Sequence, residues 1–527
     1  MLVQGPSGAG RVTLSNFSEA VALSAHMTPE RIGASDLERA MTFREWDRRA
    51  SRLANALLGL GAAPGDRIAV LAFNCIEWLE IYAAAARAGL IAVPINFRLV
   101  TDEIRFVLED CGARLLIVQD ALTGPIEAIG FEKIIHFGTR PAPKGFLGYE
   151  DLIAKASDRP PEVQVAPENT WTLMYTSGTT GRPKGAIRSH RAGALLSLTT
   201  EVELGFSRRD TGLLVMPMCH ANSLYFMGAL TFCGAPVQVY SRASFDPEHL
   251  LRTLADGDIT FTSLVPTHYV MMLGLEESVR LAHVPERVTK LMISSAPARR
   301  DTKEAILAFF RNSGLFELYG STEQGWATML QPEEQFTKLG SVGRECVGSK
   351  PIRLLDADGE EVGDGEVGEL FSATPYAFDG YWNLPEKTAE AFRGDYLTVG
   401  DLAMRDADGF YTLVDRKNNM IISGGENVYP SEVENAIGAH DAVKDVAVIG
   451  APDDKWGERV HGFVVLHQGA HATEAELIAF AKERLAGYKR PRSLSIIAED
   501  EMPRNATGKI LHRVLRNKVA TCDSAVG

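Results

Sequence analysis

Residues 175–185 read YTSGTTGRPKG and directly follow a short apolar stretch, residues 171–174, that we expect to form a strand. The glycines allow the backbone to fold tightly and to turn several N–H groups toward one point. Lys184 adds one mobile cation, and four hydroxyls add neutral donors, those of Thr176, Ser177, Thr179 and Thr180. A polyphosphate group needs this combination of donors. The spacing differs from the Walker pattern, because Lys184 follows an Arg-Pro pair rather than a glycine. We therefore expect a phosphate-binding loop of another kind.

On the N-terminal side of this loop, helical and strand-like stretches alternate. Residues 43–60 have helical spacing and end near two glycines, and residues 67–73 have the pattern of a buried strand. A helix over residues 76–88 and a strand over residues 90–95 follow. Such alternation is typical of a layered α/β domain with a parallel sheet, and the pattern continues to about residue 350.

The pattern changes twice in the C-terminal part of the chain. Residues 351–414 contain short strands interrupted by Gly, Asp and Pro, which predicts a small β-rich subdomain. Beyond residues 415–419 come a glycine-rich turn, a helix from Ser431, two strands and a helix over residues 474–485. This last unit has the size of a separate α+β domain, roughly a hundred residues. We therefore divide the chain into domains of residues 1–416 and 417–527.

Length, charge and cysteine content narrow the class of protein. A chain of 527 residues is too long for one compact core, and a net charge of −14 argues against a broad basic surface for nucleic acid. The six cysteines form no C-x-x-C pair, and no apolar run is long enough to span a membrane. The N-terminus lacks the pattern of a signal peptide and the C-terminus ends SAVG, so we expect a cytoplasmic protein.

The 175–185 segment resembles the phosphate loop of the adenylate-forming superfamily, which includes acyl-CoA synthetases, firefly luciferase and the adenylation domains of peptide synthetases. Further segments resemble that family's motifs and occur in the same order. These are LYGSTEQG at 318–325, the Gly-Asp strand end at 396–403, DRKNNMIISGGENVYPSEVE at 415–434 and PRNATGK at 503–509. The resemblance covers nearly the whole chain. It implies a large N-terminal domain of αβαβα layers with the β-rich subdomain, followed by a small, mobile α+β lid.

The resemblance also implies a reaction: a carboxylic acid and Mg²⁺·ATP give an acyl-adenylate, which then reacts with the thiol of coenzyme A. Glu323 would hold Mg²⁺, a hard ion that prefers carboxylate and phosphate oxygens. Asp401 would bind the ribose hydroxyls with help from Arg416. Lys509 would stabilise the charge that develops when the carboxylate attacks the α-phosphate. Tyr319 would stack on adenine, opposite the loop of Ser295, Ala296 and Pro297. The implied nucleotide site is completed by Thr176, Ser177, Gly178, Thr179, Thr180, Lys184, Gly320, Ser321 and Thr322.

Two further groups of residues follow from the same resemblance. His220 would lie beside the acyl site and have a catalytic role with Lys509, Glu323 and Thr176. The acyl pocket would be lined by His220, Ala221, Leu224, Tyr225, Gly320, Gln324, Gly325 and Trp326. The lid would pivot at Asn418, where the family usually has Asp or Lys. Coenzyme A would contact Ser423, Gly424, Gly425, Trp456, Tyr488 and Arg490.

Several readings remain open from the sequence. An enzyme that loads a carrier protein with the acyl group is the nearest alternative, although the stretch HANSLY at 220–225 offers no aspartate for an amino-acid substrate. A non-catalytic nucleotide-binding module is a second one, against which the joint presence of Lys509, Glu323 and Asp401 argues. The mixed apolar and aromatic residues of the assigned pocket fit a fatty, an alicyclic or an aryl acid. The assigned segments contain no basic residue for a second carboxylate, which disfavours dicarboxylic acids. All expected partners are small molecules, and a homo-oligomer is compatible with the sequence.

Overall fold

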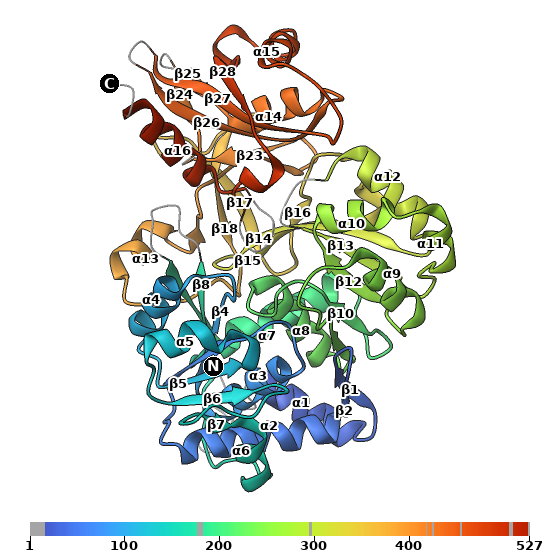
Figure 1. Cartoon of the computed structure of the whole chain (residues 1–527), viewed down its shortest axis with the longest axis vertical. Coiled ribbons are helices and arrows are strands. Elements are labelled where there is room, and N and C mark those ends of the chain that lie inside the picture. The colour runs from blue at the N-terminus through green and yellow to red at the C-terminus, as the bar shows by residue number, and fades with distance from the viewer. Residues whose placement is uncertain are drawn as a thin grey trace, which may run out of the picture.

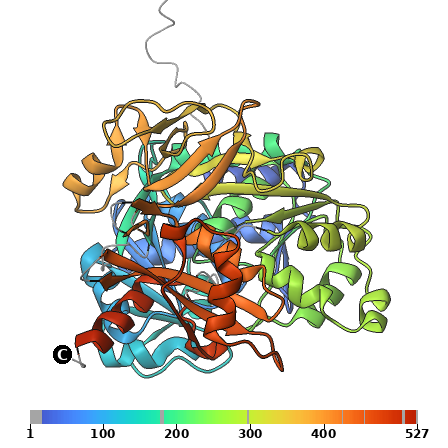
Figure 2. The ribbon, with the colours of Figure 1, turned by 90° about the horizontal axis from the view of Figure 1, so that it is seen from above.

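The structure is a computed structural model that describes residues 16–176, 183–294, 298–417, 419–423, 426–453, 456–504 and 510–524. A large N-terminal domain contains layered sheets and helices, and a smaller C-terminal domain lies at one end of the long axis, shown in red (Figure 1). Figure 2 shows the same arrangement from above. The described residues include no helix long and apolar enough to cross a membrane.

Two large sheets form the frame of the N-terminal domain. One has the order β19 (Gly380–Tyr381), β9 (Lys184–Ser189), β8 (Thr170–Thr176), β4 (Ile91–Ile95), β3 (Arg67–Leu71), β5 (Leu115–Gln119), β6 (Ile134–Phe137) and β7 (Leu147–Gly148). The other has the order β16 (Arg344–Glu345), β15 (Gly325–Leu330), β14 (Gly314–Ser321), β13 (Lys290–Ile293), β12 (Phe261–Leu264), β10 (Gly212–Leu214), β11 (Val237–Val239), β1 (Ile32–Ser35) and β2 (Ala40–Thr42).

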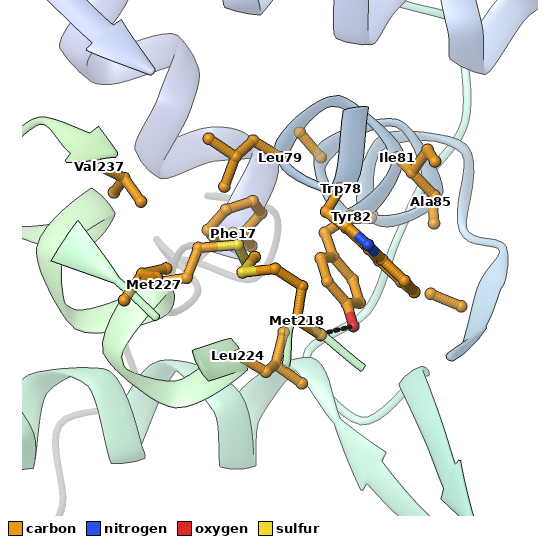
Figure 3. Packing of buried hydrophobic residues seen from close by; sticks show 14 of the residues in the cluster. Phe17, Trp78, Leu79, Ile81, Tyr82, Ala85, Met218, Leu224, Met227 and Val237 are labelled. Carbon is orange, nitrogen blue, oxygen red and sulfur yellow. Dashed lines mark hydrogen bonds between the residues drawn. The ribbon is translucent and has the colours of Figure 1, made fainter. Parts of the chain in front are cut away.

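Helices fill the space between the two sheets and cover their outer faces. The central hydrophobic core joins both sheets through α1 (Phe17–Met27), α2 (Phe43–Gly59), α3 (Glu77–Ala88), α7 (His190–Leu204) and α8 (Ala221–Phe232). Figure 3 shows this packing, in which the Tyr82 hydroxyl donates a hydrogen bond to the Met218 carbonyl at 3.0 Å. α4 (Thr101–Cys111) and α5 (Thr123–Ile129) cover one outer face, and α9 (Pro247–Asp256), α10 (Pro266–Leu273) and α12 (Arg300–Phe309) cover the other. The expected αβαβα layering is confirmed.

The expected parallel pairing holds for most neighbouring strands of the two large sheets, but not for all of them. β3 pairs with β4 and β5 in parallel, as the sequence pattern predicts. β8 and β9, however, pair antiparallel, and so do β14 and β15. The segment between β8 and β9 is only residues 177–183. A parallel connection needs a crossover of a dozen or more residues, so these two strands can only form a hairpin.

The C-terminal third contains two smaller sheets. The β-rich region pairs β20 (Phe392–Arg393), β21 (Tyr396–Leu397), β18 (Gly368–Ala373), β22 (Asp401–Arg405) and β23 (Tyr411–Arg416), with β17 (Lys350–Leu355) against β18. The last sheet has the order β25 (Glu426–Val428), β24 (Ile421–Ser423), β27 (Gly457–Leu466) and β26 (Val443–Asp453), with β28 (Ser493–Ile496) against β27. α14 (Pro430–Gly438), α15 (Glu474–Lys482) and α16 (His512–Ser524) pack on it.

A buried ion pair fixes β14, the strand that leads into the LYGSTEQG segment. Lys303 of α12 donates a hydrogen bond to the Glu317 carboxylate of β14, and both side chains are almost completely buried. Burial raises the pKa of Glu317, while the neighbouring Lys303 ammonium opposes that rise. The charged pair therefore ties the outer helix layer to the strand that carries the candidate site.

We predict that Lys303→Met lowers the free energy of unfolding by about 3–5 kcal/mol, because Glu317 is then left buried without a cation. Urea denaturation followed by tryptophan fluorescence measures this change. The double variant Lys303→Met with Glu317→Leu should recover most of the loss, since an apolar pair of similar volume often replaces a buried ion pair without cost. Equal destabilisation of the single and double variants would show that the pair is not the cause.

Candidate active site

The two ends of the phosphate loop meet beside Glu323. Thr176 is the last residue of β8 and Lys184 the first of β9, and the two are paired across the hairpin. The Thr176 hydroxyl lies 3.4 Å from the Lys184 carbonyl and 3.5 Å from Glu323 Oε1. Four predicted contacts lie outside the described residues, namely Ser177, Gly178, Thr179 and Thr180. The hairpin thus places both ends of the loop near the Glu323 carboxylate.

Glu323 lies in the tight turn between β14 and β15 with only 8% of its surface exposed. Its Oε1 accepts a hydrogen bond of 2.9 Å from the Tyr381 hydroxyl, and its backbone carbonyl accepts one of 2.8 Å from Phe378 N. No described residue donates a hydrogen bond to Oε2. The Tyr381 hydroxyl therefore holds the carboxylate in place through one of its oxygens.

The single carboxylate of Glu323 suits a magnesium ion that binds together with a nucleotide. Nowhere among the described residues do three or more His, Cys, Asp or Glu side chains gather in a way that could hold a metal. Mg²⁺ is commonly bound through one or two protein carboxylates, with phosphate oxygens and water as the other ligands. Glu323 is therefore the residue that would hold Mg²⁺, and the ion would supply charge neutralisation at the phosphates.

Lys184 lies beside an aromatic ring that the sequence analysis did not identify. Its Nζ is 4.1 Å from the centroid of the Tyr381 ring, within the range of a cation–π contact. Burial lowers the pKa of Lys184, and the Glu323 carboxylate opposes that change. Burial and the same carboxylate raise the pKa of Tyr381. Nothing in the local sequence around residue 381 marks this tyrosine, because only the pairing of β19 with β9 brings it into the site.

The residues expected to bind adenosine lie together. Asp401, the first residue of β22, is paired with Arg416, the last residue of β23. Arg416 Nε lies 3.0 Å from Asp401 Oδ1, and the Tyr319 hydroxyl donates a hydrogen bond of 2.7 Å to Oδ2. Burial and the Asp401 carboxylate raise the pKa of Tyr319, so its hydroxyl stays protonated as a donor. Ser295, Ala296 and Pro297, expected on the opposite face of the adenine, lie outside the described residues.

A buried arginine, also missed from the sequence, fixes the segment that precedes Glu323. Arg188 of β9 is 2% exposed, and it donates hydrogen bonds to the carbonyls of Thr322, at 2.6 Å, and of Tyr376. The Tyr225 hydroxyl donates to the same Thr322 carbonyl at 3.1 Å. Ser321 Oγ accepts a hydrogen bond of 3.0 Å from Gln324 N, which closes the turn. A Cβ at Gly320 would lie 2.1 Å from the Gly325 carbonyl oxygen, so this hairpin requires glycine.

Most residues assigned to the acyl pocket come from α8 and β15. His220 occupies the N-cap position of α8 without a side-chain capping bond, and Leu224 and Tyr225 are buried on that helix just beyond Ala221. Trp326 of β15 packs edge-on against Tyr225, with ring centroids 5.1 Å apart. Burial lowers the pKa of His220 to about 4, so the imidazole is neutral at pH 7. Its Nε2 has no hydrogen-bond partner among the described residues, and neither has the side-chain amide of Gln324.

The structure changes the interpretation of Gly325, which we expected to face the acyl chain. Its φ is +71°, a backbone conformation that residues other than glycine rarely adopt. A Cβ added at this position would lie 2.7 Å from Cδ2 of Tyr376. The Tyr376 side chain is fully buried. A larger residue at position 325 would therefore strain the hairpin, and its effect on substrate choice could not be separated from that strain.

The residues assigned to coenzyme A are carried by the C-terminal domain. Ser423 of β24 is paired with Gly457, which adjoins Trp456, and the Trp456 ring packs against the Arg492 guanidinium. Tyr488 is 39% exposed beside β25, and Arg490 Nε donates to the Leu485 carbonyl at 3.0 Å. Four expected residues lie outside the described part of the chain: the hinge Asn418, the turn glycines Gly424 and Gly425, and Lys509.

Comparison with known proteins agrees with this geometry. Family models described as AMP-binding enzyme and as AMP-binding enzyme C-terminal domain match residues 21–382 and 432–509. A 2-succinylbenzoate–CoA ligase from Geobacillus kaustophilus is 34% identical over 496 residues, covering 94% of this chain and 96% of the relative. A feruloyl-CoA synthase from an Amycolatopsis species is 35% identical over 498 residues, covering 94% and 96%.

A solved structure of o-succinylbenzoate CoA synthetase from Bacillus subtilis, bound to its acyl-adenylate intermediate, superimposes with a TM-score of 0.83. It is 30% identical, and the match covers 94% of this chain and 97% of that one. The family match spans the phosphate-loop hairpin, the Glu323 turn and the C-terminal domain. The chain therefore belongs to the AMP-binding enzyme family, as an AMP-forming acid–thiol ligase of the acyl-CoA synthetase type that uses Mg²⁺·ATP and coenzyme A.

Proposed function

We propose that this acyl-CoA synthetase activates a compact aryl carboxylic acid. The observation that carries the proposal is the buried aromatic pair of Tyr225 and Trp326, which pack edge to face. Phe226 extends this pair into an aromatic wall of the proposed acyl pocket, with its ring centroid 5.3 Å from that of Trp326. Aromatic groups favour such edge-to-face and offset contacts with one another. Bulky rings at this position should also shorten the space available to an extended alkyl chain.

The comparisons lend support of a second kind. The two relatives described above are named for 2-succinylbenzoate and feruloyl substrates, both of which contain an aromatic ring. Identities of 34% and 35% make those acids a guide to the class of substrate and leave the individual acid to experiment. The buried Arg188 beside Tyr225 adds a polar boundary to the aromatic wall, with its Cζ 4.7 Å from the Tyr225 ring centroid.

A screen of carboxylic acids tests the proposed substrate class. Pyrophosphate release is measured with Mg²⁺·ATP and benzoate-type, cinnamate-type, cyclohexane-based and saturated acids of graded length. We expect the highest kcat/KM for an aryl acid, and thioester formation only when coenzyme A is present. A clear preference for long saturated acids would overturn the proposal. Adenylate formation without transfer to coenzyme A would instead support a carrier-protein-loading enzyme.

We further propose that the candidate residues act in two steps. In the first, the substrate carboxylate attacks the α-phosphate, a C–O–P linkage forms, and the bond to the departing pyrophosphate breaks. Thr176, Lys184 and Glu323 bind and orient the phosphates and their metal, and Lys509 stabilises the developing charge. His220 stays neutral beside the acyl group. In the second, the coenzyme A thiol attacks the adenylate carbonyl, and AMP leaves.

The C-terminal domain would rotate between these steps about Asn418, with the domain boundary between residues 416 and 417. β23 ends at Arg416 in one sheet, and β24 begins at Ile421 in another, which supports a boundary between them. Rotation would move Lys509 away from the active site and bring Gly424 and Gly425 to it. These glycines would then line the path of the pantetheine arm. One pocket could then serve both reactions, as in other enzymes gated by a hinge.

We also propose that the enzyme works in the cytoplasm. Five cysteines in the described part of the chain are free thiols: Cys75, Cys111, Cys219, Cys233 and Cys346. Free thiols persist where the compartment is reducing, whereas oxidising compartments favour disulfides. A fluorescent fusion of the full chain tests this location. Its position is followed by microscopy in intact cells and by fractionation of lysed cells.

For the pocket, we predict that Trp326→Ala lowers kcat/KM for the preferred aryl acid roughly two- to tenfold, the range expected for loss of one aromatic contact. The same variant should raise kcat/KM for bulkier or longer acids, because it opens space beside Tyr225. Trp326→Phe is the matched control and should retain the aryl preference. Unchanged ratios between acids in Trp326→Ala would remove Trp326 from the acyl pocket.

For the two steps, we predict opposite effects of two lid variants. Lys509→Ala should reduce formation of acyl-AMP from ATP by roughly 10²–10³-fold, because one transition-state contact is lost. It should convert supplied acyl-AMP and coenzyme A to thioester at a rate near that of the wild type. Gly425→Leu should do the reverse, since its side chain needs the space of the pantetheine arm. Each half-reaction is assayed alone, and equal loss of both steps in both variants would favour a single fixed site.

A further inference from the structure

Tyr381 reaches the phosphate site from a distant part of the chain and is held there firmly. β19 pairs antiparallel with β9, so that Tyr381 lies opposite Ala186. Hydrogen bonds fix the segment on both sides: Asp379 Oδ2 accepts from Ser189 N at 2.8 Å, and Trp382 N donates to the Gly185 carbonyl at 2.8 Å. Tyr381 N donates to Thr388 Oγ1 at 2.9 Å. With 7% of its surface exposed, the tyrosine has little freedom to move.

The two ends of this side chain contact two groups of opposite charge. Its hydroxyl donates a hydrogen bond of 2.9 Å to Glu323 Oε1, and its ring lies 4.1 Å from Lys184 Nζ. A hydrogen bond to one oxygen of a carboxylate fixes the direction of the other, and such partners of metal-binding side chains strongly affect metal affinity. Glu323 Oε2 accepts no hydrogen bond from a described residue and stays available to a ligand.

The Lys184 ammonium and the Glu323 carboxylate each contact Tyr381 and form no ion pair with each other. Lys184 is half-buried and Glu323 is buried, conditions in which opposite charges attract strongly. No ion pair connects the two side chains, although the Glu323 carboxylate opposes the fall in the Lys184 pKa that burial causes. The Tyr381 ring contacts the lysine, and the Tyr381 hydroxyl contacts the carboxylate. Neither charge is therefore neutralised by the other before a nucleotide binds.

We propose that Tyr381 is a positioning residue with two separable functions at the phosphate site. Its hydroxyl orients Glu323 for the metal that accompanies ATP, and its ring holds Lys184 away from Glu323 so that the ammonium remains free for phosphate oxygens. The first function rests on the proposed role of Glu323 as the metal-binding carboxylate. The second depends only on the positions of Lys184, Tyr381 and Glu323.

Binding of a non-hydrolysable ATP analogue tests both functions without turnover. The dissociation constant of α,β-methylene-ATP is measured by calorimetry with and without Mg²⁺, and the ratio of the two values reports the metal-dependent part of affinity. Tyr381→Phe keeps the ring and removes the hydroxyl. We expect it to leave the metal-free dissociation constant unchanged and to reduce the Mg²⁺-dependent gain roughly 10- to 100-fold.

Tyr411→Phe is a matched control that removes a similar buried bond elsewhere. The Tyr411 hydroxyl of β23 donates a hydrogen bond of 2.7 Å to Glu345 Oε1 of β16, outside the phosphate site. We expect this variant to lower Tm about as much as Tyr381→Phe does, with no change in the Mg²⁺-dependent gain. A loss of that gain in both variants would show that general destabilisation, and not positioning of Glu323, is responsible.

Tyr381→Leu removes the ring as well. Lys184 and Glu323 should then pair directly, so the metal-free affinity should also fall, roughly tenfold or more for the loss of a charged contact to phosphate. If Tyr381→Leu and Tyr381→Phe give the same metal-free affinity, the ring has no spacing function.

The variant Glu323→Gln separates the proposed metal-binding role of Glu323 from the proposed orienting role of Tyr381. If it removes the Mg²⁺-dependent gain while Tyr381→Phe does not, only the orienting function fails; if it has no effect, the metal assignment itself is wrong.

Discussion

The site depends on one constraint: a buried carboxylate in a tight turn must be held by groups from other parts of the fold. Glu323 cannot be oriented by its own hairpin, because the adjoining turn bonds are made by Ser321 and Gln324. The donors come from β8 and β19, through Thr176 and Tyr381. The hairpin of β8 and β9, the β14–β15 turn and the segment that carries Tyr381 must therefore be built correctly together before the phosphate site exists.

The layered scaffold explains how this assembly is kept rigid. The two large sheets share one hydrophobic core through the helices between them, so the edges of both sheets are fixed relative to each other. Arg188 crosses from β9 to the carbonyls of Thr322 and Tyr376, and Lys303 secures β14 from its outer side. Buried polar contacts of this kind hold geometry well because breaking one leaves its partner unsatisfied.

The residues that we propose for adenosine and for the acyl group both contact the short segment of residues 319–322. Tyr319 directs its hydroxyl to Asp401 in the β-rich region, whereas the Thr322 carbonyl receives Tyr225 from α8. A shift of the Glu323 turn would therefore disturb the proposed nucleotide site and the proposed acyl site together. This coupling gives a physical reason for glycine at position 320, where even a methyl group would collide with the backbone of β15.

The sequence by itself determined the family, the order of the motifs and the layered fold class. It also predicted Glu323, Asp401, Arg416 and Thr176 as site residues, because each belongs to a local motif that resembles one of the family's. Tyr381 and Arg188 could not be found in that way. Their roles arise from pairing between segments far apart in the chain, such as those of Ser189 and Asp379, which are 190 positions apart. No local pattern encodes such pairing. Which residue fits at position 325 was likewise decided only by the tertiary structure. The φ of Gly325 is positive, and the buried Tyr376 ring leaves no room for a side chain there.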